Sequence, residues 1–259
     1  MDLGIHGRSA IVCAASRGLG RGCALALAEA GVNLVINGRD PAALDAAAAD
    51  IRRSSGVTVT AVAGDVGTRE GQAAILAACP HPDILINNNG GPPFRDFREL
   101  DRAALLGGLT ANMVTPIELI QKVIDSMTER GFGRIVNITS LSVRMPLAGL
   151  DLSSGARAGL IAFLSGISRQ VAHRNVTINN LLPGSFDTRR LRQGIARNSQ
   201  KTGRSEAETA AADQAGIPAQ RFGTPEEFGA LCAFLCSVHA GYMTGQNILI
   251  DGGAFPGAF

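Results

Sequence analysis

The sequence predicts an α/β protein with a single doubly wound domain, in which about seven parallel strands carry helices on both faces. Short apolar runs alternate along the chain with longer amphipathic stretches, which is the pattern of repeated strand–helix–strand units. Hydrophobic residues make up 46% of the chain, but aromatic residues only 4%, and there is no Trp. The core must therefore consist of Ala, Val, Ile and Leu, as in a buried parallel sheet. A length of 259 residues suits one such domain.

The apolar runs define the expected strands, and the stretches between them define the helices. The expected strands are residues 9–15, 32–38, 57–64, 83–88, 133–139, 175–184 and 247–253. Helices are expected over 18–31, from Pro41 onward, over 112–130 and over 152–173.

Residues 187–217 break this alternation. They are polar, basic in their first half, and expected to be helical. Because they follow the end of an expected strand, where sites in such sheets lie, we expect a substrate lid here.

Charge and cysteine content argue against several classes of partner. The net charge of +2 is too small to indicate binding to nucleic acid or to an anionic membrane. We find no apolar signal core and no run approaching the ~20 residues of a membrane span. The five cysteines are scattered and lack the spacing of zinc ligands. We expect buried reduced thiols, no metal and a cytoplasmic location.

The first expected strand leads into a glycine-rich turn, CAASRGLGRG (residues 13–22). Such a turn directs backbone N–H groups and the positive end of a helix toward a phosphate. Glycines alone are weak support, because plain tight turns also contain them. The strand before and the helix after favour a dinucleotide site. Its predicted binding residues are Ser16, Arg17, Gly18, Leu19 and Gly20.

The end of the second expected strand indicates which dinucleotide is bound. An acidic residue there would bind the adenosine ribose hydroxyls and repel a 2′-phosphate. This chain has Gly38-Arg39 instead, and Arg17 lies in the phosphate loop. Because guanidinium groups bind phosphate well, the pair favours NADP(H) over NAD(H). The alternative is that both are solvated surface arginines.

Along essentially its whole length, the sequence resembles the short-chain dehydrogenase/reductase family. The family's TGxxxGxG loop maps onto residues 13–20, with Cys13 and Ala14 in place of the Thr and the first Gly. Further matches are Asp65-Val66, Asn87–Gly90 for the NNAG motif with Asn89 in place of Ala, Pro183-Gly184 with Thr188, and residues 221–227 and 251–253. The resemblance implies a Rossmann-type domain. It adds as cofactor-binding residues Asp65, Val66, Asn88, Gly90, Arg157, Pro183, Gly184, Phe186 and Thr188.

The resemblance also implies where the catalytic residues lie. In the family, a Tyr donates the proton to the carbonyl oxygen, a Lys four residues later supports it, a Ser orients the carbonyl, and an Asn supports a water relay. Asn112 and Ser140 match the Asn and the Ser, whereas Ser153 and Arg157 occupy the Tyr and Lys positions. We expect these four residues to form the site, without the standard acid. A serine hydroxyl is far less acidic than a phenol, and Arg does not lose its proton in a protein.

Other residues are weaker candidates for the proton donor. Tyr242, the only tyrosine, lies in a segment that is structural in the family, and Asp151 is expected to cap the helix at 152–173. His173 and His239 are expected at helix ends, and Arg144 lies in the loop after the fifth strand. A water held between Ser140, Ser153 and Arg157 is the remaining route, with Arg157 stabilising an oxyanion.

These observations predict an NADP(H)-dependent oxidoreductase acting on a carbonyl or alcohol. It is similar overall to 3-oxoacyl reductases and has an atypical Ser–Ser–Arg site. One alternative is a non-catalytic, dinucleotide-sensing protein, and another is a non-redox enzyme on the same fold. Arg157 and the basic half of residues 187–217 suggest an anionic small-molecule substrate, although a solvated helix face is the simpler interpretation. Family analogy implies a homotetramer or homodimer through helices 112–130 and 152–173.

Overall fold

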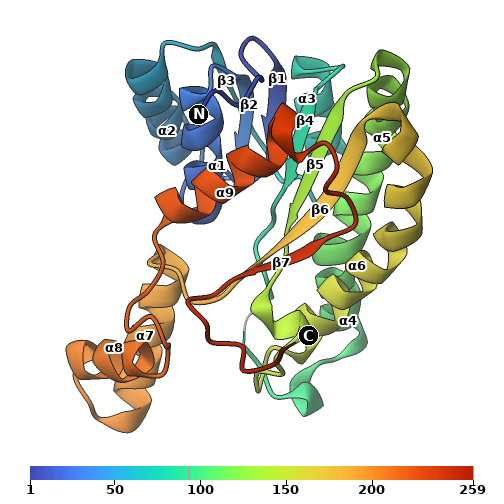
Figure 1. Cartoon of the computed structure of the whole chain (residues 1–259). Helices are drawn as coiled ribbons and strands as arrows, with labels where there is room; N and C mark the ends of the chain where they lie inside the picture. Colours follow the sequence, from blue (N-terminus) through green and yellow to red (C-terminus); the bar gives the residue numbers. More distant parts are fainter. Residues whose placement is uncertain (93, 259) are drawn as a thin grey trace.

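The computed structural model describes residues 1–92 and 94–258, and within them a parallel sheet lies at the centre of the molecule (Figure 1). Its strand order is β3-β2-β1-β4-β5-β6-β7, and every pairing is parallel. The strands are β1 (Ser9–Val12), β2 (Asn33–Gly38), β3 (Val59–Ala63), β4 (Ile84–Asn87), β5 (Gly133–Ile138), β6 (Val176–Pro183) and β7 (Asn247–Ile250). The predicted doubly wound α/β fold is confirmed, and each strand lies within its predicted run.

Helices connect successive strands and form two layers. They are α1 (Gly18–Glu29), α2 (Pro41–Ser55), α3 (Arg69–Ala78), α4 (Arg102–Leu109), α5 (Thr115–Arg130), α6 (Asp151–Val171), α7 (Arg189–Thr202), α8 (Glu206–Ala215) and α9 (Pro225–Cys236). Short 3₁₀ turns span Phe97–Glu99, Leu141–Val143, Ala172–Arg174 and Val238–Ala240. One apolar cluster packs α1, α2 and α9 on one face of the sheet, and a second packs α3, α5 and α6 on the other. All five cysteines are buried and unpaired, as predicted.

Side-chain caps mark the starts of several helices, but the predicted cap of α6 is wrong. Asp40 accepts from the N–H of Ala43 and caps α2, as such residues commonly do. Asp151 does not cap α6: Leu150 is the N-cap residue, and Asp151 is the first residue inside the helix. Its carboxylate still lies in the first turn, where it favours the positive end of the helix dipole.

The helical run from Arg102 to Arg130 is longer than the predicted helix over 112–130. It consists of α4, a π-helical turn (Thr110–Val114) and α5. By length and composition alone it is long and apolar enough to cross a membrane, contrary to our expectation from the sequence. Its α5 half contributes Leu119, Val123 and Met127 to the core beside the sheet.

Two helices project from the rest of the molecule beyond the end of β6. They are α7 and α8, drawn in orange in Figure 1. The predicted helical character of residues 187–217 is therefore confirmed, as two helices. The predicted role of this segment as a lid stays a prediction.

Candidate active site

The carboxyl ends of the parallel strands bring the predicted site residues to one edge of the sheet. The loops after β1, β2, β3 and β4 carry the nucleotide motifs. Ser140 follows β5, and Pro183-Gly184 lies at the end of β6. Open parallel sheets bind ligands at this edge.

The loop between β1 and α1 is shaped for close approach of a phosphate. Gly18 has a φ of 58°, a left-handed conformation that glycine adopts without strain. A Cβ atom on Gly20 would collide with the carbonyl of Ala14, and one on Gly18 would lie 3.4 Å from the Cγ2 of Thr188. Asn88 Nδ2 donates to the Ala14 carbonyl oxygen at 3.4 Å. The predicted cofactor residues after β1, β4 and β6 are therefore in contact, and this cradle fits a dinucleotide.

Ala14, at the position of the family's first glycine, has a φ of 47°. An L-residue with a Cβ atom is strained in this left-handed region, which costs about 1–2 kcal/mol. The loop thus keeps a conformation suited to glycine although glycine is absent.

Two arginines that were predicted to bind the cofactor lie beside this cradle. Arg17 Nη2 pairs with Asp40 Oδ2 at 2.9 Å, and both side chains are about half exposed. Arg39 is exposed and makes no ion pair with any described residue, and its Nη2 would lie 3.9 Å from a Cβ atom on Gly90. The Ala43 N–H, and secondarily Arg17, lower the pKa of Asp40. The exposed Arg39 is therefore available for an anionic group such as a 2′-phosphate.

Two further predicted cofactor residues follow β3. Asp65 is exposed, and its Oδ1 accepts from the N–H of Gly67 at 2.8 Å. Val66 is buried and lines a small cavity behind the loop. Hence the two neighbours face different surroundings, one polar and open, the other apolar.

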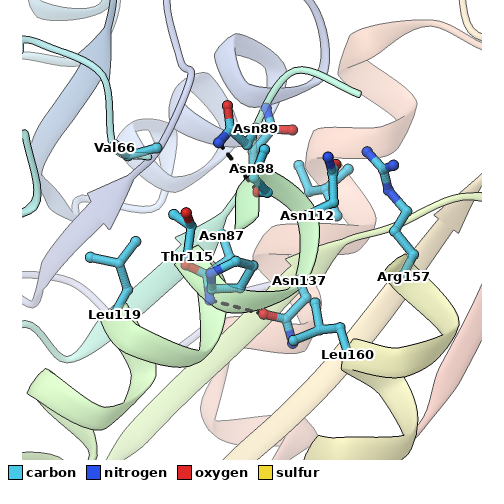
Figure 2. Close-up of a pocket in the computed structure, with 13 residues that line it drawn as sticks. Val66, Asn87, Asn88, Asn89, Asn112, Thr115, Leu119, Asn137, Arg157 and Leu160 are labelled. Atoms are coloured by element: carbon cyan, nitrogen blue, oxygen red, sulfur yellow. Dashed lines mark hydrogen bonds between the residues drawn. The ribbon is translucent and has the colours of Figure 1, made fainter. Parts of the chain in front are cut away.

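That cavity has a volume of about 20 Å³, enough for one water molecule. Figure 2 shows its lining, which includes Val66, Asn87, Asn88, Asn89, Asn112, Thr115, Asn137 and Arg157. Asn87 Oδ1 and Thr115 Oγ1 are buried and have no hydrogen-bond partner among the described residues. Asn112 Nδ2 donates to the Gly108 carbonyl at 3.2 Å across the π-helical turn. Asn112 and Arg157, both predicted as catalytic, therefore line one cavity.

Ser153 and Arg157 are joined directly. They lie one turn apart on α6, and Arg157 Nη1 donates to Ser153 Oγ at 2.5 Å. Only 4% of Ser153 and 8% of Arg157 is exposed. Burial, and secondarily the positive charge of Arg190, lower the pKa of Arg157 to about 10. The guanidinium therefore stays charged at neutral pH.

Ser140 stands somewhat apart from this pair. Its Oγ accepts from the N–H of Ser142 at 3.1 Å and caps the turn after β5. No hydrogen bond joins it to Ser153 or Arg157, and it does not line the cavity. Three of the four predicted catalytic residues are thus brought together by direct contacts or a shared lining.

None of the alternative proton donors forms a side-chain hydrogen bond or an ion pair with Arg157 or Ser153 in the described part of the chain. Tyr242 is fully exposed on the loop before β7, at the amino end of that strand. His173 and His239 are exposed and bond to nearby backbone carbonyl oxygens. Asp151 and Arg144 are also exposed. Tyr242 therefore lies at the wrong edge of the sheet to replace the missing acid.

The segment after β6 is held in place by a backbone hydrogen bond of Gly184 and by the packing of Phe186. The N–H of Gly184 donates to the Ile250 carbonyl at 3.0 Å, which holds the turn beside β7. Phe186 is buried, and its ring packs edge-on against Phe228 at a centroid distance of 5.3 Å. Phe186 therefore packs into the core against α9 beside the site. Its contact with the cofactor stays a prediction.

An asparagine ladder crosses the sheet beneath the site, and sequence reasoning missed it. Asn87 donates to Asn137, Asn137 to Asn180, and Asn180 to Asn247, each at 2.9 Å. These side chains link β4, β5, β6 and β7. The recurrence of Asn in four expected strands was the signal that could have revealed the ladder.

Comparisons with known proteins agree with this geometry. A family model described as "Enoyl-(Acyl carrier protein) reductase" matches residues 13–254. The chain is 34% identical to the NADPH-dependent reductase BacG of Bacillus subtilis (strain 168), over 95% of this chain and 97% of the relative. It is 30% identical to the 3-oxoacyl-[acyl-carrier-protein] reductase FabG of Vibrio cholerae, covering 98% of this chain and 99% of the relative.

Solved structures of NADPH-dependent reductases share this fold. The crystal structure of YwfH, an NADPH-dependent reductase involved in bacilysin biosynthesis, superposes with a TM-score of 0.91 at 33% identity, covering 96% of this chain and 99% of the other. L-Sorbose reductase from Gluconobacter frateurii, in complex with NADPH and L-sorbose, gives a TM-score of 0.93 at 27% identity, over 98% of each chain. With the match to the family model over residues 13–254 and relatives of 30% identity or more over nearly the whole chain, the chain belongs to the short-chain dehydrogenase/reductase family.

Proposed function

We propose that the protein is an NADP(H)-dependent oxidoreductase that acts on a carbonyl or alcohol through an atypical Ser–Arg pair. The observation that carries this proposal is the buried hydrogen bond between Ser153 and Arg157, on the helix that borders the cofactor cradle. Relatives described as NADPH-dependent reductases support the choice of cofactor and of reaction class.

The chain offers residues for each part of the cofactor. The N–H groups of the loop from Ser16 to Gly20 would hold the pyrophosphate, and Arg39 with Arg17 the 2′-phosphate. Asp65 and Val66 would contact the adenine, as the family resemblance implies. When bound, NADPH supplies the hydride.

Arg157 would stabilise the negative charge that develops on the carbonyl oxygen when hydride is transferred to the carbonyl carbon, because its guanidinium is charged and buried. Because its pKa is about 10, it keeps its proton at pH 7 and does not act as the acid. Ser153 holds one edge of the guanidinium in place. Water must then deliver the proton, so we expect slower turnover than with a phenolic acid.

The first experiment is a fluorescence titration with NADPH and, separately, with NADH, followed by absorbance assays of NADPH oxidation with a panel of carbonyl compounds. Micromolar NADPH binding with substrate-dependent oxidation supports the proposal. Binding without any oxidation favours the non-catalytic, dinucleotide-sensing alternative. No binding of either nucleotide contradicts the proposal and favours cofactor-free chemistry.

The Ser–Arg pair can also be converted to the family's pair. Ser153→Tyr combined with Arg157→Lys is expected to raise carbonyl reductase activity at least tenfold, because it restores a phenolic acid and an amine that lowers its pKa. Each single substitution serves as a control and is expected to give less than the double variant. An unchanged rate with intact NADPH binding would show that the pocket does not present a carbonyl to this position.

By family analogy we also propose a homotetramer or homodimer through α5 and α6. Exposed apolar side chains beside and on these helices, such as Val114 and Phe163, support it. Light scattering after size-exclusion chromatography tests this assembly, and a monomeric mass contradicts it.

A further inference from the structure

Arg157 has donor capacity that the protein does not use. A guanidinium carries five N–H donors in a planar fork. Among the described residues, only Ser153 accepts from it. The side chain is more than nine-tenths buried, and it extends from α6 toward the cavity that Asn112 also lines (Figure 2).

No acidic side chain compensates this charge. None of the ion pairs in the described part of the chain involves Arg157, and no carboxylate raises its pKa. A buried cation without a partner of opposite charge is strongly unfavourable. A ligand of opposite charge would remove this cost.

A second cation approaches from α7. Arg190 Nη1 and Nη2 donate to the carbonyls of Gly91 and Pro92, each at 3.0 Å, so this guanidinium lies on the loop after β4. Its positive charge reaches Arg157 and further lowers the pKa of that residue. Arg192, by contrast, is paired with Asp187 at 2.7 Å. Both guanidiniums therefore adjoin the segment after β4. The buried Arg157 lines the cavity with Asn88 and Asn89, and Arg190, an exposed residue, is bonded to the next stretch of that segment.

The nicotinamide ribose is one possible acceptor for Arg157, but its hydroxyls are neutral and leave the buried charge of Arg157 uncompensated. A carboxylate neutralises charge and accepts two parallel N–H bonds from one guanidinium. In the proposed function, Arg157 also polarises the reacting carbonyl oxygen. The carboxylate and the carbonyl of the substrate must therefore both lie within reach of the one guanidinium of Arg157. The carboxylate must then be attached close to the carbonyl.

We propose that the substrate is an oxo acid, a carbonyl compound whose carboxylate lies beside the carbonyl and ion-pairs with Arg157 and Arg190. This inference rests on the proposed function, because it names the substrate class of the same site.

Calorimetric titration tests the anion site without turnover. The probe is oxamate, which carries a carboxylate beside an unreactive carbonyl, and the matched neutral compound is ethyl oxamate. Both are titrated into the protein with NADP⁺ present and absent. We expect oxamate to bind at least tenfold more tightly than the ester. Equal binding of the two, or binding of neither, overturns the inference.

Variants locate the binding site. Arg157→Met is expected to remove the preference for oxamate, and Arg157→Lys to retain part of it because the charge remains. Arg190→Gln is expected to reduce the preference several-fold. Lys201→Gln, which removes the same charge from the exposed far end of α7, is the control and is expected to have no effect. An unchanged preference in Arg157→Met also overturns the inference.

NADPH titration of each variant separates the two proposals. If Arg157 binds only the ribose, Arg157→Met weakens NADPH binding and leaves the ratio of oxamate to ester affinity unchanged, which overturns the oxo-acid inference alone. If NADPH does not bind the wild-type protein, the reductase proposal fails. The oxamate titration without NADP⁺ still decides whether the anion site exists.

Discussion

Arg134 and Arg157 are both buried arginines, but their surroundings differ sharply. Arg134, on β5, donates to the backbone carbonyls of Ser237, Gly133 and Asn175 and to the Asn175 side chain, all at 2.8–3.1 Å. Its guanidinium also stacks on the Phe132 ring, 4.3 Å from the centroid. Arg157 has one hydroxyl partner. Burial lowers the pKa of both to about 10.

The contrast shows that burial alone does not reveal what an arginine does. Every edge of Arg134 meets an acceptor supplied by the fold, so it ties β5 to the segments around Asn175 and Ser237. Arg157 meets almost none, and its remaining N–H groups are available to a ligand. The number of satisfied donors distinguishes a structural arginine from a binding one.

The largest expected effect comes from removing the satisfied arginine. Arg134→Met should lower the free energy of unfolding by about 3–5 kcal/mol, because it leaves several buried carbonyls without a donor. Urea unfolding followed by circular dichroism measures this. The NADPH affinity of the remaining folded protein should not change. A loss below about 1 kcal/mol would show that water replaces the guanidinium.

The opposite sign is expected for the unsatisfied arginine. Arg157→Met should raise the free energy of unfolding of the ligand-free protein by about 1–4 kcal/mol, because it removes an uncompensated buried charge. The pKa of Arg157 is depressed in the folded state, so its cost is fully present below pH 10 and is relieved only between about pH 10 and 12.5. The full gain should therefore appear in urea unfolding at pH 7. A destabilised variant would contradict the assignment of an unsatisfied cation.

Arg39 extends the comparison to an exposed arginine without an ion pair. Arg39→Ala should weaken NADPH binding about tenfold and leave NADH binding unchanged, because only the 2′-phosphate distinguishes the two nucleotides. The fluorescence titration that establishes cofactor binding measures both affinities. Equal weakening for NADPH and NADH would place Arg39 on a shared part of the cofactor.

The smallest effect concerns backbone strain in the phosphate loop. Ala14→Gly should change the free energy of unfolding by less than about 1 kcal/mol, in the stabilising direction. Relief of the left-handed strain at Ala14 outweighs the greater flexibility of glycine in the unfolded chain. Thermal unfolding detects a shift of this size. A lower melting temperature would show that the Ala14 methyl group packs favourably.

The sequence predicted the sheet well because its strands are continuous apolar runs that only burial in a parallel sheet explains. The ends of the strands were predicted less accurately. The predicted strand over 9–15 includes Cys13 and Ala14, which already belong to the loop after β1. The start of the long helical run was missed because Gly107 and Gly108 are poor helix formers.

For the site, spacing alone correctly placed Ser153 and Arg157 on one helix face. The basic half of residues 187–217 was also considered as a partner of Arg157, but spacing could not select Arg190, because its place beside the loop after β4 depends on how α7 packs. The asparagine ladder also escaped prediction, because its contacts depend on the register between strands and not on neighbours along the chain.

The ladder has a consequence for exchanging parts of this chain with relatives. Its amides all point the same way, so each asparagine depends on the next from Asn87 to Asn247. A chimaera that imports β5 or β6 without its asparagine leaves an amide donor and an amide acceptor unpaired in the sheet, at about 1–3 kcal/mol each, and one that imports β4 or β7 leaves one such group. The four asparagines should therefore be kept or replaced together when strands are exchanged, although some 160 residues separate the first from the last.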